Sequence, residues 1–539
     1  MRFRNLASLV TSLCVSAFLS SMAYGQNPPQ AQNGRAEVSK EVKHDVSPAL
    51  RDLPSIELDR DNDKGPREHP VKPIPQPDQK TTPADDKVHQ SFTVGPFVAA
   101  TPVPFTAGTT VDGVGIGNYN VNAAPPDTNG AVGLNHYVQW VNEAFGVFDK
   151  SSGALLPGFP KNGNTLWAGF GGPCETSNDG DPIVQYDKAA NRWIMTQFAV
   201  SSTPYRQCVA VSTSGDPTGT YTRYEFTYGT DFNDYPKVGV WPDGYYITYN
   251  MFANAQSFKG SKVCAFDRTA MINGTAATQQ CFQLSTSFGG LLPSDLDGTT
   301  APPAGEPNYV VNFGSNSLNV WKFHVDWANP ANTTLSGPTN LPVAAFTRAC
   351  NGGACIPQPG TSQLLDSLGD RLMYRLAYRN FGTHAAIVVN HSVQIGTNKK
   401  NIISGLRWYE LRITNQTPTV FQQGTFAPAG DFRWMGSMAM DRLGNIGIGY
   451  SISSSTRLPS VFFTGRQPGD QLGTMQAETS IFGGSGAQQR NLNRWGDYSS
   501  LSVDPVDDCT MWFTTEYLKT NGTFNWSTRI GKIKFNNCN

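Results

Sequence analysis

From about residue 115 to the C-terminus, short runs of alternating apolar and polar residues follow one another, separated by Gly, Asn, Asp or Pro. Aromatic and β-branched residues fill many of the apolar positions. This pattern predicts short β-strands joined by tight turns. Several runs share one order, in which an acidic residue, a small-residue segment, a second aspartate and a bulkier run follow each other. We expect the second aspartate to accept backbone N–H bonds in an Asx turn, at Asp187, Asp243, Asp441 and Asp504.

The runs group into seven repeated units, with the clearest starts at Asp127, Asp181, Asp234, Arg433 and Arg494. A unit of roughly 50 to 70 residues can hold a four-stranded antiparallel sheet. A solenoid would need shorter and more uniform repeats, and a β-sandwich would not repeat in this way. The predicted fold class is therefore all-β, a single β-propeller of seven four-stranded blades. The first strand of each blade is expected to line the central channel.

The segment before the propeller divides into two parts. Residues 1–25 contain two arginines, an apolar stretch and a small-x-small site at Ala23–Gly25, so we expect a signal peptide and a secreted protein, extracellular or periplasmic. Residues 26–114 are rich in Pro, Lys, Asp, Glu and Gln, which predicts a disordered spacer or propeptide. The propeller domain is expected over residues 115–539. No later segment is long and apolar enough to predict a membrane span.

The charge composition limits the classes of partner that the protein is expected to bind, and the cysteine count suggests disulfides. Of the 539 residues 15% are charged and the formal net charge is -1, so nothing in the charge pattern predicts binding to nucleic acid or to an acidic membrane. Nine cysteines are present, and Cys14 lies in the predicted signal peptide. The other eight suit an oxidising compartment. We predict four disulfides between sequential neighbours: Cys174 with Cys208, Cys264 with Cys281, Cys350 with Cys355, and Cys509 with Cys538.

Four aspartates precede predicted innermost strands, namely Asp127, Asp181, Asp234 and Asp497. At the mouth of a propeller such carboxylates would converge on one funnel, and their mutual repulsion would raise at least one pKa. We interpret Asp181, Asp234 and Asp497 as candidate acid, base or nucleophile, and Asp127 as a substrate-binding residue. No cofactor is predicted, although the same group could hold Ca²⁺. The alternative is structural, with each acid tying its own loop to the next blade.

Arginines and aromatic residues also gather near the predicted inner positions. A guanidinium beside an aromatic plane suits an acidic sugar, so candidate substrate-binding residues are Arg375, Arg433, Trp434, Arg494 and Trp495. Alternatively, the arginines pair with acids of neighbouring blades and the tryptophans belong to the core. Tyr498 or Tyr374, with one of the propeller histidines His136, His324, His384 and His391, could abstract a proton as in a polysaccharide lyase. A histidine without a placed partner is more often structural.

Several stretches resemble a group of secreted bacterial β-propellers described as sialidase-like or BNR-like. They are PPDTNGAVG, GDPIVQYDKAANRWIMTQFA, NDYPKVGVWPDGYY, RWMGSMAMDRLGNIGIGYS and RWGDYSSLSVDPVDDCTMWFTTEY, and the resemblance covers about residues 120 to 539. It implies a propeller fold and secretion, but no established reaction. Sialidases carry Ser-x-Asp-x-Gly-x-x-Trp boxes, and this chain departs from them: Asp187 to Trp193 is longer and lacks the Gly, and Asp441 to Gly444 has no Trp.

Three classes of function follow from these patterns. The first is a secreted carbohydrate-active enzyme, a glycoside hydrolase or polysaccharide lyase working in the funnel on a polysaccharide or glycoconjugate, and monomeric. The second is a non-catalytic propeller that binds a glycan or a protein partner, and the third is a structural surface protein without a ligand. The chain has no Gly-x-Ser-x-Gly, His-Glu-x-x-His, P-loop or Rossmann glycine pattern, which disfavours serine hydrolases of that type, zincins and nucleotide enzymes.

Overall fold

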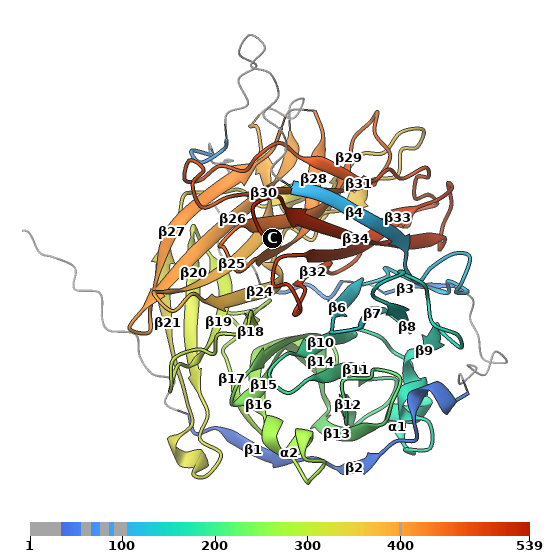
Figure 1. The fold of residues 1–539 in the computed structure, drawn as a ribbon, viewed down its shortest axis with the longest axis vertical. Helices are drawn as coiled ribbons and strands as arrows, with labels where there is room; N and C mark the ends of the chain where they lie inside the picture. Colours follow the sequence, from blue (N-terminus) through green and yellow to red (C-terminus); the bar gives the residue numbers. More distant parts are fainter. Residues whose placement is uncertain are drawn as a thin grey trace, which may run out of the picture.

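The computed structural model describes residues 34–54, 66–69, 71–75, 86–90, 105–397, 402–428 and 430–539. The predicted signal peptide, residues 1–25, lies outside the described residues. Strands dominate the described chain, and its α-helices α1 (Pro173–Thr176) and α2 (Arg268–Ile272) are short (Figure 1). None of the helices in the described residues has the length and apolar character that crossing a membrane requires.

The strands form successive antiparallel groups around a common centre, coloured in sequence order from cyan to red in Figure 1. The first three groups are β6 (Asn129–Val132), β7 (His136–Val141), β8 (Ala144–Asp149) and β9 (Lys161–Asn162); β10 (Ile183–Asp187), β11 (Arg192–Ala199), β12 (Tyr205–Ser212) and β13 (Tyr221–Gly229); and β14 (Asp231–Trp241), β15 (Gly244–Ala253), β16 (Ser257–Phe266) and β17 (Thr278–Gln283). The next two are β18 (Leu292–Asp297), β19 (Asn308–Gly314), β20 (Ser317–His324) and β21 (Thr334–Pro342); and β24 (Met373–Asn380), β25 (Ala385–Ile395), β26 (Ile403–Thr414) and β27 (Thr417–Phe426). The last two are β28 (Phe432–Met440), β29 (Ile446–Ser453), β30 (Ser460–Arg466) and β31 (Thr479–Phe482); and β32 (Ser500–Val503), β33 (Met511–Leu518), β34 (Trp526–Phe535) and β4 (Phe105–Asp112).

The first strands of successive groups contact one another in chain order, and β32 contacts β6, so that the ring closes. This arrangement is a β-propeller, and the predicted fold class is confirmed. One contact departs from the regular pattern, because β18 and β24 are hydrogen-bonded in parallel and merge two groups into one eight-stranded sheet. For that reason the exact number of blades stays a prediction.

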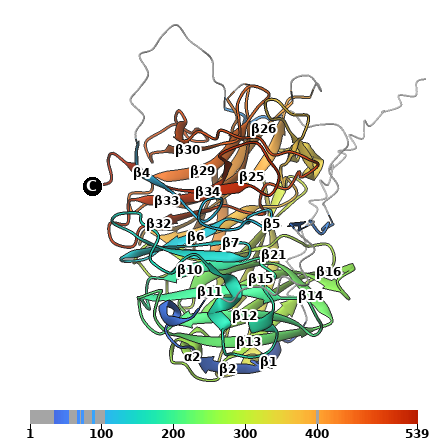
Figure 2. The ribbon, with the colours of Figure 1, turned by 90° about the vertical axis from the view of Figure 1, so that its right-hand side faces the viewer.

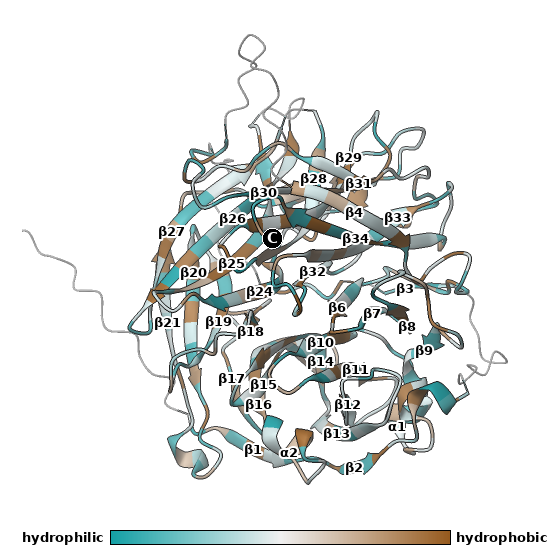
Figure 3. Cartoon of the chain, viewed as in Figure 1, coloured by the Kyte–Doolittle hydropathy of each residue, from teal (hydrophilic) through white to brown (hydrophobic). Residues whose placement is uncertain are grey.

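Aromatic side chains fill the space between neighbouring groups. Tyr137 of the first group stacks on Trp512 of the last with ring centroids 5.3 Å apart, and Phe226 meets Phe266 edge-on at 4.8 Å. Brown, hydrophobic positions recur along the strands beside teal, hydrophilic ones (Figure 3). The alternation in the sequence therefore corresponds to the buried packing between sheets. Three of the four predicted turn aspartates accept backbone N–H bonds: Asp441 from Leu443 and Asn445, Asp504 from Val506, and Asp187 from Ala190. The carboxylate of Asp243 instead accepts from the hydroxyl of Tyr246.

Parts of the segment from 26 to 114 are described, and some of these parts form short strands. Strand β1 (Glu37–Lys40) adds to the outer edge of β17, and β2 (Lys43–Val46) adds to β13, at the periphery in both views (Figures 1 and 2). The short strand β3 (Arg67–Glu68) pairs in parallel with β5 (Ala123–Ala124). Strand β4 completes the last sheet beside β34, where Asp112 pairs with Arg529 at 2.6 Å. Composition gives no sign of these edge strands, because backbone hydrogen bonds hold them rather than apolar side chains.

The four disulfides join the predicted cysteine pairs, at Cys174–Cys208, Cys264–Cys281, Cys350–Cys355 and Cys509–Cys538. Their presence favours a protein that folds in an oxidising compartment. Cys509 and Cys538 flank β33 and β34, so this bridge fastens the sheet in which the two ends of the propeller meet.

Removing the Cys509–Cys538 bridge is expected to destabilise the protein more than removing Cys350–Cys355. The bridges close segments of 29 and 5 residues, and the chain-entropy relation gives about 3.5 kcal/mol for the longer and about 2 kcal/mol for the shorter. Urea unfolding of the two Cys→Ser double variants under non-reducing conditions measures the difference. Equal losses of stability would contradict the expectation.

Candidate functional site

The four aspartates singled out in the sequence line one pocket of about 250 Å³, here called the acid pocket. Asp127, Asp181 and Asp497 stand just before β6, β10 and β32, and Asp234 lies in the first half of β14. These four inner strands are consecutive around the ring. The convergence is thus a result of the repeat, since each acid occupies the entrance of an inner strand.

Strained backbone and cross-loop hydrogen bonds hold these carboxylates in place. Asp127 and Asp181 have φ values of +44° and +47°, and Tyr235 has +56°, a left-handed conformation that is unusual for a bulky residue. An oxygen of Asp181 accepts from the backbone N of Tyr235 at 3.1 Å, and one of Asp127 accepts from the backbone N of Asp497 at 2.9 Å. Asp127 and Asp181 therefore tie neighbouring blades together, which is the structural alternative considered for them.

Asp234 differs from both, because none of the described residues donates a hydrogen bond to its carboxylate. Burial, followed by the charges of Asp181 and Asp497, raises the pKa of Asp234 to about 8. Burial also raises the pKa of Asp127 and of Asp181, helped by Asp497. A buried carboxyl that accepts no hydrogen bond and lies beside other acids favours its protonated form, because no hydrogen bond stabilises the negative charge.

Asp497 has the opposite environment. Burial alone would raise its pKa, but Arg494 and Arg371 outweigh that effect and hold the pKa of Asp497 below its ordinary value. Arg494 forms an ion pair with Asp497 and donates through Nε to the carbonyl of His69 at 2.9 Å. The acid pocket thus holds three carboxyls with a raised pKa, those of Asp127, Asp181 and Asp234, and one carboxyl, that of Asp497, that stays ionised.

A buried lysine lies close to the acid pocket. Lys237 Nζ is 3.4 Å from the ring centroid of Tyr235 and 3.9 Å from that of Tyr498, and it donates to the carbonyl of Pro236. Burial lowers the pKa of Lys237 to about 8, against the attraction of Asp181, Asp497 and Asp127. A cation at this position offsets part of the repulsion among the acids.

The rest of the acid pocket combines an apolar wall with the N-terminal segment. Phe198 and Phe232 line it on one side, and Lys72 lies 5.1 Å from the ring centroid of Phe232 while donating to the carbonyl of Ala255. His69 and Val71 of the same segment also line it. Aromatic and apolar side chains beside a few polar groups are typical of small-molecule sites.

The other predicted site residues lie elsewhere in the structure. Arg433 pairs with Glu478 at 2.7 Å and does not line the acid pocket. Trp434 and Trp495 are buried against each other, with ring centroids 5.7 Å apart. Arg375 is buried beside Asp295 and Asp297, so Arg494 lines the pocket whereas Arg375 and Arg433 do not. The alternative interpretation, structural pairing and core packing, agrees with these positions.

Neither predicted tyrosine offers a base to the pocket. Tyr498 donates its hydroxyl to the carbonyl of Pro182 at 2.9 Å, and Tyr374 donates to that of Val238 at 2.9 Å. Burial raises the pKa of both hydroxyls well above the usual range. The four propeller histidines His136, His324, His384 and His391 do not line the pocket.

Sequence reasoning missed the contributions of the N-terminal segment and of Lys237. His69 and Lys72 belonged to a stretch whose composition predicts disorder, and no motif marks them. Lys237 follows Tyr235 by two residues, but a register shift between Asp234 and Lys237 interrupts the alternation there, so the sequence pattern alone does not place it. Within the described residues no three His, Cys, Asp or Glu side chains are arranged to hold a metal ion.

Comparisons with known proteins show weak structural similarities and no family for this chain. No protein-family model matches the chain, and no curated protein matches it. Among solved structures, an α-L-arabinofuranosidase from Fusarium graminearum with an iminosugar inhibitor aligns at 10% identity and TM-score 0.32 over 80% of this chain and 99% of that one. The WD40 domain of SCAP from fission yeast aligns at 9% identity and TM-score 0.32 over 74% and 82%. An ulvan lyase bound to a saccharide aligns at 9% and TM-score 0.27 over 75% and 79%. Similarities this low do not indicate what the chain binds or does.

Proposed function

We propose that this protein hydrolyses glycosidic bonds in the acid pocket, with Asp234 as general acid and Asp497 as the ionised carboxylate. One observation carries the proposal: two carboxyls in one pocket have pKa values shifted in opposite directions, that of Asp234 to about 8 and that of Asp497 below its ordinary value. Two carboxyls with separate protonation states are what acid-assisted glycoside cleavage requires.

The chemistry can be assigned to atoms. Asp234 gives its proton to the glycosidic oxygen as the bond from that oxygen to the anomeric carbon breaks. Asp497 either attacks the anomeric carbon or removes a proton from the attacking water, and water supplies the hydroxyl of the product. Arg494, paired with Asp497, keeps that carboxylate ionised until it attacks or takes up the proton of the water.

The surroundings of the two carboxyls suit a sugar. Phe198 and Phe232 provide an apolar surface for a ring, and the buried Arg371 lines the same pocket as a fixed hydrogen-bond donor. Hydrolysis is favoured over elimination because neither Tyr498 nor Tyr374 is placed to act as a base in the pocket. The four disulfides agree with work outside the cytoplasm.

A polysaccharide panel tests the proposal. We expect the purified protein to release reducing ends from at least one glycan without forming unsaturated products, and the Asp234→Asn/Asp497→Asn double variant to release none. Asp231→Asn is the matched control, because Asp231 lies on the same strand β14 but pairs with Lys259 outside the pocket. Binding without turnover would favour a non-catalytic glycan-binding propeller. Ultraviolet absorbance from an unsaturated product would indicate a lyase instead.

A further inference from the structure

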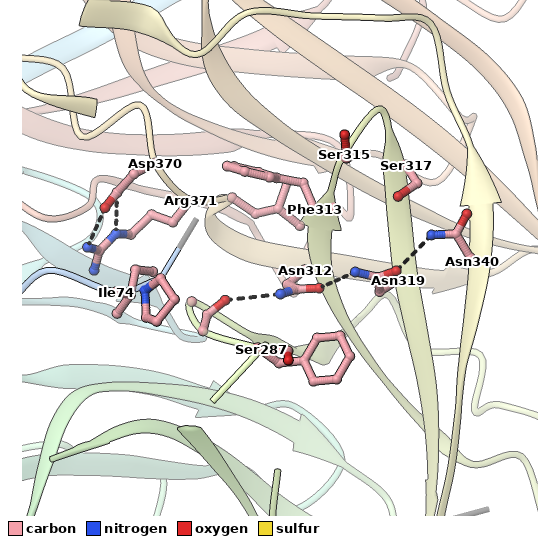
Figure 4. Close-up of a pocket in the computed structure, with 16 residues that line it drawn as sticks. Ile74, Ser287, Asn312, Phe313, Ser315, Ser317, Asn319, Asn340, Asp370 and Arg371 are labelled. Atoms are coloured by element: carbon pink, nitrogen blue, oxygen red, sulfur yellow. Dashed lines mark hydrogen bonds and ion pairs between the residues drawn. The ribbon is translucent and has the colours of Figure 1, made fainter. Parts of the chain in front are cut away.

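A second pocket of about 250 Å³ lies over the fourth group of strands, here called the asparagine pocket (Figure 4). Asn312 of β19, Asn319 of β20 and Asn340 of β21 line it together with the loop around Phe288. The three asparagines are cross-strand partners, since Asn312 pairs with Asn319 and Asn319 with Asn340 in the sheet register. They therefore project from one face of the sheet as a row.

Hydrogen bonds connect the row in one direction. The amide of Asn340 donates to the oxygen of Asn319 at 2.9 Å, that of Asn319 donates to Asn312 at 3.1 Å, and that of Asn312 donates to the carbonyl of Gly289 at 3.1 Å (Figure 4). No described residue donates to the amide oxygen of Asn340, which is exposed at the end of the row. An amide that donates a hydrogen bond becomes polarised, and its own oxygen then accepts more strongly. The oxygen of Asn340 is therefore suited to accept a hydrogen bond from a ligand.

The lining of the asparagine pocket has no unbalanced charge. Its polar groups are amides, serine hydroxyls and backbone, and its single charged pair is Arg371 bound to Asp370 at 2.8 Å. Phe288 and Phe313 add apolar surface. A neutral ligand with several hydroxyl groups and one apolar face fits this combination, whereas an anion would find the only cation already paired.

The two pockets are neighbours. Arg371 lines both of them and is itself fixed, because it is buried and lies 4.5 Å from the ring centroid of Tyr235. The segment at residues 71–75 also passes from one to the other: Val71 and Lys72 line the acid pocket, and Ile74 lines the asparagine pocket. Each pocket is smaller than the roughly 300–1,000 Å³ of sites that enclose drug-sized molecules, so each accommodates a small unit.

We propose that the asparagine pocket binds a neutral sugar unit of the same saccharide chain whose glycosidic bond lies in the acid pocket. The inference rests on the proposed function and deepens it, because it names a neutral oligosaccharide rather than a single sugar as the substrate. Asn340 and Asn319 accept hydrogen bonds from the hydroxyl groups of this unit and donate hydrogen bonds to them. Arg371 forms the wall between the two bound units. Longer chains consequently bind more tightly than short ones.

Calorimetric titration with defined saccharides tests this assignment. The probes are disaccharides and pentasaccharides of the cello, xylo, manno, galacto and arabino series, with oligogalacturonides as the charged comparison. The Asn340→Ala variant is expected to bind the preferred pentasaccharide about 2- to 12-fold more weakly, which corresponds to one lost hydrogen bond, while its affinity for the disaccharide is unchanged. Thr339→Ala is the matched control, since Thr339 is the next residue on β21 and alternation directs it to the other face.

The outcomes separate this inference from the proposed function. If wild type cleaves a glycan but Asn340→Ala and Asn319→Ala keep the same preference for longer chains, the asparagine pocket has no part in binding. Tighter binding of oligogalacturonides than of every neutral chain would also overturn the inference. If no glycan is cleaved, yet neutral pentasaccharides bind and the asparagine variants weaken that binding, the hydrolase proposal falls and the saccharide site stands. Thermal unfolding of each variant confirms that a loss of binding does not come from unfolding.

Discussion

Replacing Asp234 with asparagine is expected to lower kcat by about 10²- to 10⁴-fold on the glycan that the protein cleaves, the usual contribution of general acid catalysis. The amide keeps the shape of the side chain but has no proton to give to the leaving oxygen. Substrate binding should change little, because the described residues make no hydrogen bond to this carboxylate. The expected signature is a fall in kcat at nearly constant KM, measured as release of reducing ends.

The pH dependence of wild type follows from the same two carboxyls. Asp234 must be protonated to act, so activity is present below about pH 8 and is lost as the pH rises through that value. Asp497 must be ionised, and its pKa is lowered, so activity is lost on the acid side only below the usual titration range of an aspartate. A profile of kcat/KM is therefore expected to be broad, with its alkaline limb near pH 8.

Measuring the stability of the Asp234→Asn variant shows whether it has lost only catalysis or also its folded structure. The pKa of Asp234 is raised in the folded protein, so wild type loses stability as the pH rises from 3.8 towards about 8, where the folded carboxyl must ionise. Asparagine cannot ionise, and Asp234→Asn should be at least as stable as wild type at neutral pH. The assignment of Asp234 is wrong if the folded variant keeps wild-type turnover, or if it loses turnover and stability together.

The fold was predictable because it is a repeat of a local pattern. Alternating residues between turn aspartates such as Asp441 indicate strands, and the recurrence of such units predicts a ring of sheets. The same argument placed Asp127, Asp181, Asp234 and Asp497 near one another, since residues at equivalent positions of a propeller converge on its axis. Repulsion among them predicts that at least one pKa is raised, but which acid stays ionised was not predictable, because this depends on how the loops place Arg371 and Arg494 beside Asp497.

Other parts of the site could not be read from one sequence. His69 and Lys72 reach the acid pocket through backbone pairing of β3 with β5, which has no side-chain signature. The sequence predicts Trp434 and Trp495 as possible ligand contacts, but a tryptophan next to an arginine is equally a core residue next to a buried ion pair. Sequence gives the residue types, and only the packing of neighbouring sheets decides which face of a strand they occupy.

Replacing Arg375 with methionine is expected to cost about 3 to 5 kcal/mol of unfolding free energy, the largest effect on stability that we expect from a single substitution. Its guanidinium contacts Asp295 at 2.5 Å and Asp297 at 2.8 Å and donates to the carbonyl of Leu501 at 2.8 Å. Arg375 is in β24, the two aspartates are in β18 and Leu501 is in β32, so one side chain joins the inner strands of three groups. Asp295 in turn accepts from the backbone N of Val240 in β14 at 2.9 Å.

The size of the effect comes from the charges left behind. Arg375 and both acids are at most 2% exposed, and the methionine would leave Asp295 and Asp297 buried with Lys188 as the remaining close cation, at 2.8 Å from Asp297. Arg412→Met is the surface control, because Arg412 is 37% exposed and its pair with Glu410 is worth about 1 kcal/mol or less. Adding Asp295→Asn to Arg375→Met removes one unpaired charge and should restore part of the loss in urea unfolding. If Arg375→Met costs no more than Arg412→Met, the ion cluster does not hold the inner strands together, and their packing in the ring would have to rest on the aromatic contacts between the sheets.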